Sequence, residues 1–200
     1  MLAESREKFK KIEFFLGKIF SKFGLSPNQF TILSLFFAFF SFYFLLKIKL
    51  IFALIFYFLA TILDLIDGAV ARFLKMVTKK GAYLDTICDR YVEGIILTGF
   101  LFLPLKNFIL PAKIWIFLAL FGSIMTTYVK AAAKEKGIVK EEIKKGFFGR
   151  GERMILILLS LILGIFNLNF ITYPIFLLAI FSNLGALQRI SIILSSRNKE

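Results

Sequence analysis

The most restrictive feature of this sequence is a series of six apolar stretches, each close to the length of a lipid bilayer. They cover approximately residues 29–46, 50–72, 81–104, 107–132, 153–168 and 170–192. A helix needs about 20 apolar residues to cross a membrane, and its backbone must satisfy its own hydrogen bonds because no water reaches the hydrocarbon core. The chain is 58% hydrophobic, above the roughly 45–50% of soluble domains. These stretches predict an all-α bundle of six transmembrane helices.

The region before the first apolar stretch has the pattern of an amphipathic surface helix. Between residues 4 and 24, one helical face collects Ile12, Phe15, Leu16, Ile19, Phe20 and Phe23, and the opposite face collects Lys11, Lys18 and Lys22. Such a helix lies in the membrane interface, although a soluble amphipathic helix packed on another element has the same pattern. We predict a cytoplasmic juxtamembrane helix over residues 1–26 and a six-helix transmembrane domain over residues 27–200, with a break at Gly24 to Asn28.

The basic residues gather on one side of this predicted topology. Of the 26 Lys and Arg residues, 21 fall in the N-terminal region, the 72–80 loop, the 130–153 segment and the C-terminus. Positively charged loops stay in the cytoplasm and attract anionic headgroups. The net charge of +13 therefore indicates membrane lipids, and not nucleic acid, as the partner. We expect a multi-pass protein of the cell membrane with both termini in the cytoplasm.

All four aspartates of the chain lie inside two neighbouring apolar stretches, at Asp64, Asp67, Asp85 and Asp89. An aspartate at the centre of a membrane helix costs about 2.5–3.5 kcal/mol, so this concentration must be offset by cations or by water. Asp64 and Asp67 share one helix face at i, i+3, and Asp85 and Asp89 share another at i, i+4. Because both pairs lie near predicted cytoplasmic helix ends, we expect the carboxylates to converge in one cavity.

A convergent group of carboxylates favours a hard divalent cation. The chain has no histidine and a single cysteine, Cys88, which excludes histidine-ligated metals and internal disulfides. Carboxylate oxygens are the ligands that Mg²⁺ prefers, and two such ions about 3.5–4 Å apart can bind the oxygens of a pyrophosphate. Gly68 and Gly81 would leave room for a nucleotide near the backbone. Ion pairs with Arg72 and Arg90 are the alternative, but two arginines cannot balance four carboxylates.

The window around the aspartates also carries a specific motif. It reads Asp64-x2-Asp67-Gly68-x2-Ala71-Arg72-x8-Gly81-x3-Asp85-x3-Asp89 and resembles the signature of the CDP-alcohol phosphatidyltransferase family at every fixed position. The resemblance spans nearly the whole chain. It implies a homodimeric membrane enzyme with a juxtamembrane helix and six transmembrane helices. Its reaction would move a phosphatidyl-type group from a CDP-lipid to an alcohol and release CMP.

The resemblance also implies roles for individual residues. Asp64, Asp67 and Asp85 would bind one Mg²⁺, and Asp64, Asp85 and Asp89 would bind a second, with Mn²⁺ as a substitute. Asp89 would take the proton from the attacking hydroxyl. The positions that match nucleotide contacts are Asn28, Gln29, Phe30, Thr31, Gly68, Arg72 and Thr78. For residues 28–31, an ordinary helix start capped by Ser26 explains the sequence equally well.

A second group of basic residues points to the acceptor. Its members, all at predicted cytoplasmic helix ends, are Lys130, Arg150, Arg153 and Arg189. Arginine binds phosphate through paired hydrogen bonds and lysine acts as a point charge, so this group suits an acceptor with its own phosphate. The pattern, together with residues 81–94, is similar to the branch of the family that uses inositol 1-phosphate. Ala132 departs from that branch, which often has a basic residue there, and the positive-inside rule alone also explains basic residues here.

Other functions remain to be distinguished. A glycerophosphate-using member of the family, of the phosphatidylglycerophosphate synthase type, would differ only in its acceptor. A divalent-cation transporter fits intramembrane carboxylates in general, although here the acidic residues lie toward one side. A structural membrane protein held together by Asp–Arg pairs would have no activity to lose. The lipid donor is either CDP-archaeol or CDP-diacylglycerol.

Overall fold

The computed structural model describes residues 2–139 and 147–195, with side chains from residue 11 onward. Its elements, in order, are α1 (Leu2–Phe20), the 3-10 turn η1 (Ser21–Phe23), α2 (Pro27–Leu46), α3 (Leu50–Phe73), α4 (Lys79–Phe100), α5 (Ala112–Glu135), α6 (Arg150–Phe166), the 3-10 turn η2 (Leu168–Ile171) and α7 (Thr172–Ser195). The end of the predicted cytoplasmic C-terminus, residues 196–200, and the basic segment 140–146 lie outside the described residues.

The regular secondary structure of the described residues is helical, apart from one isolated β-bridge between Phe108 and Leu110, which confirms the all-α prediction. Four segments are long and apolar enough to cross a membrane: Pro27–Leu46, Leu50–Phe73, Ala112–Glu135 and Leu168–Ser195. The other two expected spans, α4 and α6, do not meet these criteria of length and composition, and the reasons are separate. Helix α4 contains six charged residues, and α6 has only 17 residues. The count of six spans stays a prediction.

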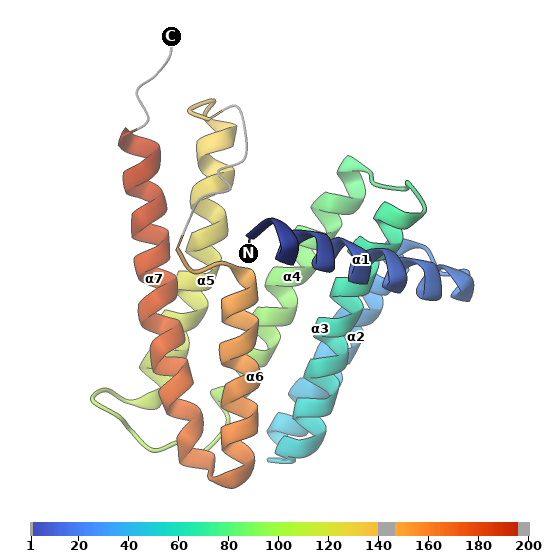
Figure 1. The fold of residues 1–200 in the computed structure, drawn as a ribbon. Coiled ribbons are helices and arrows are strands. Elements are labelled where there is room, and N and C mark those ends of the chain that lie inside the picture. The colour runs from blue at the N-terminus through green and yellow to red at the C-terminus, as the bar shows by residue number, and fades with distance from the viewer. Residues whose placement is uncertain (1, 140–146, 196–200) are drawn as a thin grey trace. The chain divides into compact units, whose positions relative to one another are not determined.

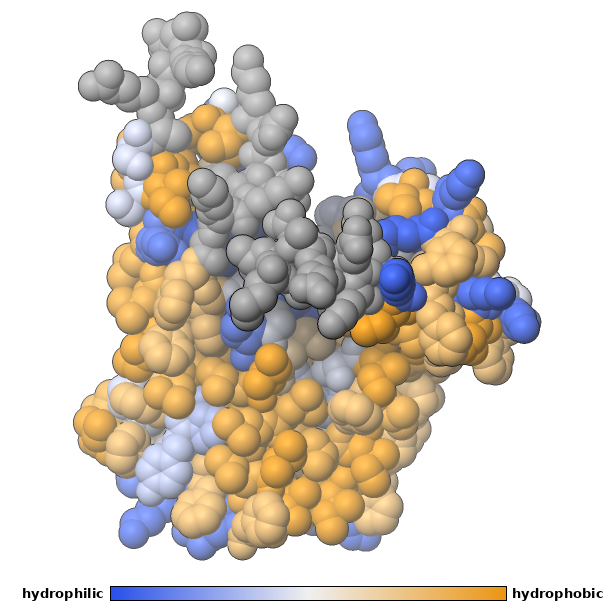
Figure 2. Space-filling model, in the orientation of Figure 1, coloured by the Kyte–Doolittle hydropathy of each residue, from blue (hydrophilic) through white to orange (hydrophobic). Residues whose placement is uncertain are grey.

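The surface of the helices is apolar over most of its visible area, and hydrophilic side chains gather toward helix ends (Figure 2). Large side chains such as Phe36, Phe39 and Phe58 are 56%, 54% and 51% exposed. A soluble protein rarely leaves such extensive apolar surface in contact with water. Together with the four candidate spans, this surface indicates a membrane protein.

The chain divides into two compact units, and the first contains Met1–Tyr43 and Ile55–Ile96. Its core combines Phe30 of α2 with Ile66 and Val70 of α3. Helix α1, dark blue in Figure 1, crosses the end of α3, where its Gly17 faces Ala69. A Cβ atom at residue 17 would lie 2.6 Å from the Ala69 carbonyl oxygen, so a glycine is required for this close crossing.

The second unit contains Phe44–Leu54 and Leu97–Glu200. Within it, α7 packs against both α5 and α6, as Figure 1 shows. Gly122 of α5 lies directly against Ser182 and Asn183 of α7, with no room for a side chain. The Asn183 side chain donates a hydrogen bond to the Leu118 carbonyl oxygen at 2.9 Å. A small residue and an interhelical hydrogen bond at one contact are typical of packing between membrane helices.

Candidate active site

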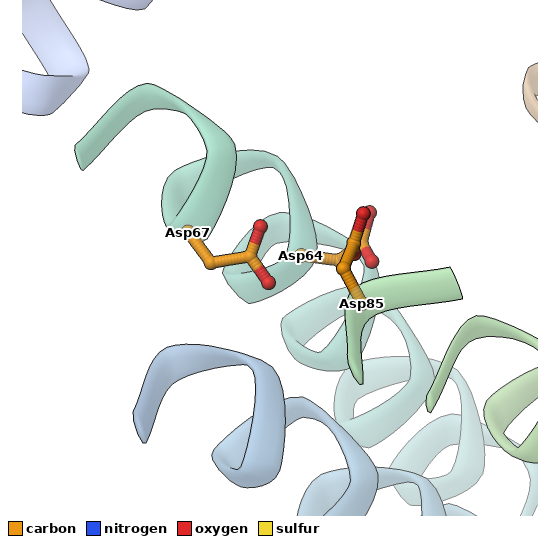
Figure 3. Close-up of side chains that lie close together, drawn as sticks. All are labelled: Asp64, Asp67 and Asp85. Carbon is orange, nitrogen blue, oxygen red and sulfur yellow. The ribbon is translucent and has the colours of Figure 1, made fainter. Parts of the chain in front are cut away.

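Three aspartates of the first unit meet at the junction of α3 and α4. Asp64 and Asp67 extend from α3 and Asp85 extends from α4 toward the same point (Figure 3). One carboxylate oxygen from each residue lies within 4.8 Å of the other two. Only residues 74–78 connect α3 to α4, so the sequence itself keeps the end of one helix beside the start of the next.

The oxygens of this group suit a hard divalent cation. A Mg²⁺ ion binds oxygen at about 2.0–2.1 Å, so two of its ligands are at most roughly 4.2 Å apart. The observed group of Asp64, Asp67 and Asp85 is only slightly wider, and small side-chain rotations would close it. Carboxylates this close repel one another more strongly away from bulk water, and a bound cation would reverse that repulsion.

A hydrogen bond from α2 orients one of the three carboxylates. The Thr31 hydroxyl donates to Oδ2 of Asp67 at 2.6 Å, and the two residues are 3% and 5% exposed. Hydrogen bonds of this kind fix the direction of metal-binding side chains and affect metal affinity. Thr31 is therefore a supporting residue of the acidic group, and the nucleotide contact expected for it stays a prediction.

A pocket of about 140 Å³ adjoins the acidic group and includes two of its members, Asp67 and Asp85. Its remaining lining consists of Pro27, Asn28, Thr31, Gly68, Ala71, Arg72, Met76, Val77, Thr78, Gly81 and Ala82. These residues come from the start of α2, the end of α3, the connecting loop and the start of α4. The pocket therefore combines carboxylates, one arginine, short polar side chains and exposed backbone at two glycines.

Five of the seven residues expected to contact a nucleotide line this pocket, and two do not. Gln29 instead accepts a hydrogen bond from the Ser26 backbone N–H at 2.7 Å, and Phe30 is 3% exposed in the core of the first unit. The helix-start interpretation explains Gln29, which satisfies a backbone N–H group at the beginning of α2, and core packing explains Phe30.

Asp89 lies one turn after Asp85 on α4 and is 9% exposed. Among the described residues, the group with mutually close carboxylate oxygens contains Asp64, Asp67 and Asp85 but not Asp89. The structure therefore brings together one of the two ligand sets that the family resemblance implies. The second metal ion and the role of Asp89 as a base stay predictions.

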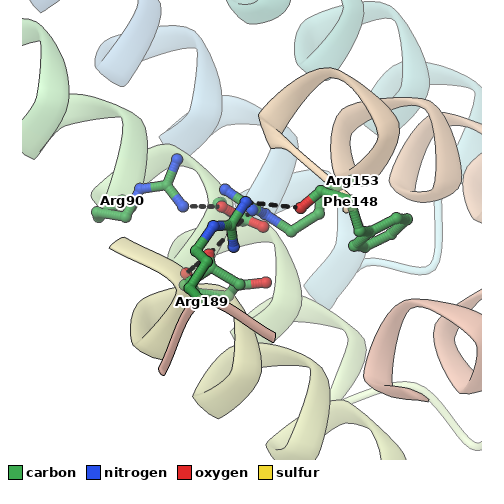
Figure 4. Close-up of polar contacts among 7 residues, drawn as sticks. Arg90, Phe148, Arg153 and Arg189 are labelled. Carbon is green, nitrogen blue, oxygen red and sulfur yellow. Dashed lines mark hydrogen bonds and ion pairs between the residues drawn. The ribbon is translucent and has the colours of Figure 1, made fainter. Parts of the chain in front are cut away.

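The four basic residues expected at the acceptor site lie in the second unit, and two of them are deeply buried. Arg153 and Arg189 are 3% and 4% exposed, whereas Lys130 and Arg150 are half-buried. Figure 4 shows the buried pair: Arg153 donates to the Thr126 hydroxyl at 3.1 Å, and Arg189 donates to the Phe148 carbonyl oxygen at 3.2 Å. Nε and Nη1 of Arg189 find no partner in the described part of the chain. Buried polar groups normally have a hydrogen-bond partner, and the bonds of a guanidinium to an anion are the strongest it forms.

A short segment before α6 supports Arg189, and the sequence pattern does not reveal it. Phe148 has a positive φ of 60°, and its carbonyl oxygen accepts from Arg189. The backbone N–H of Phe147 donates to the Gln188 side chain at 2.7 Å. A Cβ atom at Gly185 would lie 2.8 Å from the Phe147 carbonyl oxygen. The glycine inside α7 is the only sequence signal of this close approach.

Two ion pairs within the first unit were also missed. Arg72 donates to Glu13 of α1 at 2.9 Å, and Arg90 donates to Glu93 at 2.7 Å. The second pair has a sequence signal, because opposite charges at i, i+3 on a helix often interact. The first pair joins residues far apart in the sequence and has none.

Comparisons with known proteins identify relatives of this chain. The sequence profile described as CDP-alcohol phosphatidyltransferase matches residues 24–187. The archaetidylinositol phosphate synthase of Pyrococcus horikoshii is 31% identical over 190 residues, which are 95% of this chain and 95% of that protein.

Solved structures of a second relative share the fold. The phosphatidylinositol phosphate synthase of Mycobacterium tuberculosis with CDP-DAG bound superposes with a TM-score of 0.80 at 25% identity, over 94% of this chain and 96% of that one. Its complex with manganese and citrate gives a TM-score of 0.80 at 26% identity, over 93% and 90% of the two chains. Because the family profile covers most of the sequence and includes both helices of the acidic group, this chain belongs to the CDP-alcohol phosphatidyltransferase family.

Proposed function

We propose that this protein transfers the phosphatidyl or archaetidyl group of a CDP-lipid to inositol 1-phosphate and releases CMP. The product is a phosphatidylinositol phosphate or its archaeal ether-lipid equivalent. The single observation that carries the proposal is the group of three carboxylates beside a pocket with an arginine and two glycines. The relatives support it as well, since two are named for synthesis of an inositol phosphate lipid.

In the proposed reaction, a hydroxyl oxygen of the inositol ring attacks the phosphorus that carries the lipid. The bond between this phosphorus and the oxygen that bridges to CMP breaks, and CMP leaves with the electron pair. The hydroxyl proton passes to a base, for which Asp89 is our candidate. Its position supports this role, because Asp89 lies on α4 one turn after Asp85 of the acidic group and is 9% exposed.

Asp64, Asp67 and Asp85 would hold a divalent cation, and Asp89 would complete the ligands of a second one with Asp64 and Asp85. When bound, such cations neutralise the pyrophosphate and the charge that develops as the bond breaks. Mg²⁺ is the proposed ion and Mn²⁺ its substitute, in agreement with the manganese complex of the mycobacterial relative. The protein itself orients the donor through Arg72 and the backbone at Gly68 and Gly81, which line the pocket.

The acceptor phosphate would bind to Arg153 and Arg189 of the second unit, with Lys130 and Arg150 as further contacts. The buried N–H groups of Arg189 support this assignment. An arginine that is 4% exposed needs acceptors for the N–H groups of its Nε and Nη1 atoms, because an unsatisfied buried donor destabilises a protein. A phosphate dianion supplies several acceptor oxygens with a double negative charge, whereas free inositol offers neutral hydroxyls and serine a single carboxylate.

The proposed site faces the cytoplasm, and the protein forms a homodimer with six spans per chain. The arrangement of lysine and arginine residues supports the orientation. The amphipathic α1 would lie on the cytoplasmic membrane surface, since Phe15 of α1 and Phe23 of the following turn η1 are 62% and 68% exposed. The orientation would be tested by labelling single cysteines introduced at residues 47 and 75 in a Cys88→Ala background. Residue 75 should react from the cytoplasmic side of the membrane and residue 47 from the opposite side.

The test of the reaction is an acceptor screen with the purified full-length chain and a CDP-lipid. We expect CMP release only when the CDP-lipid, Mg²⁺ and inositol 1-phosphate are present together. Parallel assays would replace the acceptor with glycerol 3-phosphate, inositol or serine. Turnover with glycerol 3-phosphate would move the protein to the glycerophosphate-using branch, and turnover with inositol or serine would contradict the phosphate site. Metal flux into liposomes without CMP release would indicate a transporter.

A further inference from the structure

Helix α1 supplies an acidic residue to the arginine of the nucleotide pocket. Oε1 of Glu13 accepts a hydrogen bond from Nη2 of Arg72 at 2.9 Å. The Glu13 side chain is 23% exposed and that of Arg72 is 54% exposed. Arg72 lies in the last turn of α3 and lines the pocket beside the carboxylates. The ion pair therefore joins the pocket to a helix whose described side chains do not line it.

The guanidinium of Arg72 bonds to Glu13 and also lies close to Gly68, one turn earlier on α3. A Cβ atom at residue 68 would be 3.2 Å from Nη2 and 3.3 Å from Nη1 of Arg72. A half-exposed arginine without partners samples many rotamers, and it loses that freedom when it binds a ligand. One bond to Glu13 removes part of this freedom in advance and leaves the other N–H groups of the guanidinium available.

The packing of α1 on α3 does not depend on this ion pair. Gly17, one turn after Glu13, allows the backbones to approach, since a Cβ there would be 2.6 Å from Cβ of Phe73. Phe14 packs edge-on against Phe73 with ring centroids 5.2 Å apart. Phe20 makes a similar contact with Phe30 at 6.2 Å. These apolar contacts should keep α1 in position when the Glu13 carboxylate is removed.

We propose that Glu13 is a positioning residue, which holds the Arg72 guanidinium in the orientation that binds the diphosphate of the CDP-lipid. The inference rests on the proposed function, because it takes Arg72 as a contact of the nucleotide. Glu13 itself does not touch the ligand. Its removal should weaken donor binding and leave acceptor binding unchanged.

The test compares Glu13→Gln with the wild-type full-length chain in lipid nanodiscs. We expect the KM for the CDP-lipid to rise about 1.5- to fivefold, the range for loss of a partly exposed ion pair. The KM for inositol 1-phosphate and the unfolding temperature should not change. The Kd for CDP in the presence of Mg²⁺, measured by calorimetry, should rise by the same factor as the KM for the CDP-lipid. Glu13→Asp should restore part of the loss.

A double-mutant cycle with Arg72→Gln separates positioning from a general effect on the fold. If Glu13 acts through Arg72, the double variant Glu13→Gln/Arg72→Gln should match Arg72→Gln alone. Glu135→Gln is the matched control, because it removes an exposed carboxylate that pairs with Lys136, and it should behave as wild type. Additive losses in the double variant, or a fall in unfolding temperature with both KM values raised, would overturn the inference.

The inference and the proposed function fail in different ways. A wild-type protein that releases no CMP, or an Arg72→Gln variant with an unchanged KM for the CDP-lipid, would overturn the proposed role of the pocket and this inference with it. Unchanged KM and Kd values in Glu13→Gln, with Arg72→Gln impaired, would overturn the inference alone.

Discussion

The acidic group of the first unit and the buried arginines of the second unit are built in different ways. The three aspartates come from consecutive helices and fall within residues 64–85. In the second unit, Arg153 depends on Thr126 and Arg189 depends on a backbone carbonyl of Phe148. A motif of fixed spacing therefore describes the acidic group, whereas the basic pair depends on which distant segments pack together.

This difference has a chemical counterpart in the proposed function. The acidic group would act on the pyrophosphate that reacts, so its loss should abolish turnover with any acceptor. The arginine pair would hold a phosphate that does not react, so its loss should mainly affect the concentration of acceptor that is required. Substitutions in the two regions should therefore change different kinetic parameters.

The largest effect is expected for Asp89→Asn. The amide keeps the size of the side chain but cannot accept the hydroxyl proton, so kcat should fall about 10²–10⁴-fold, the usual contribution of a general base. The unfolding temperature should stay close to that of the wild type. Initial rates of CMP release at saturating substrates measure the effect. Retained turnover would refute Asp89 as the base.

A smaller, acceptor-specific effect is expected for Arg189→Gln. Loss of charge-assisted hydrogen bonds to a phosphate should raise the KM for inositol 1-phosphate about 10- to 100-fold. The KM for the CDP-lipid should not change. Arg189→Lys keeps the charge but not the paired donors, so its KM for inositol 1-phosphate should lie between those of the wild type and Arg189→Gln. A rise in the KM for the CDP-lipid instead would remove the distinction between the two regions.

The smallest effect is expected for Thr31→Val. The substitution removes the hydroxyl that donates to Asp67 at 2.6 Å, so the carboxylate loses its fixed orientation. The Mg²⁺ concentration for half-maximal activity should rise about tenfold. Thr61→Val is the matched control, because it removes a hydroxyl that donates to the Phe58 carbonyl oxygen within α3 instead of to an aspartate. Equal Mg²⁺ dependence in the two variants would contradict a supporting role for Thr31.

Much of the fold was predictable because long apolar segments leave few alternatives. The expected stretches 29–46 and 50–72 agree closely with α2 and α3. Agreement is poorer at α4 and α5, where Pro104 to Pro111 form an irregular connection that periodicity does not delimit. The convergence of Asp64, Asp67 and Asp85 followed from helical spacing and a short connecting loop.

Features that depend on distant contacts were not predictable from the sequence. The pairing of Glu13 with Arg72 requires α1 to cross α3 at Gly17, and no local pattern specifies that crossing. The contact of Arg189 with the Phe148 carbonyl requires a positive φ in a loop. Phe30 matched a family position that contacts nucleotide, yet its apolar ring packs in the core.

The central claim is that Asp64, Asp67 and Asp85 hold a divalent cation against the diphosphate of a CDP-lipid. The most direct test replaces Mg²⁺ with Mn²⁺ and measures ³¹P hyperfine coupling by electron–nuclear double resonance, with the full-length chain in a phosphorus-free detergent. We predict strong ³¹P coupling when wild-type protein binds Mn²⁺ and CDP-lipid, and its loss in a folded Asp85→Asn variant. Bound Mn²⁺ without ³¹P coupling in the wild type, or the same coupling in Asp85→Asn, would contradict the claim.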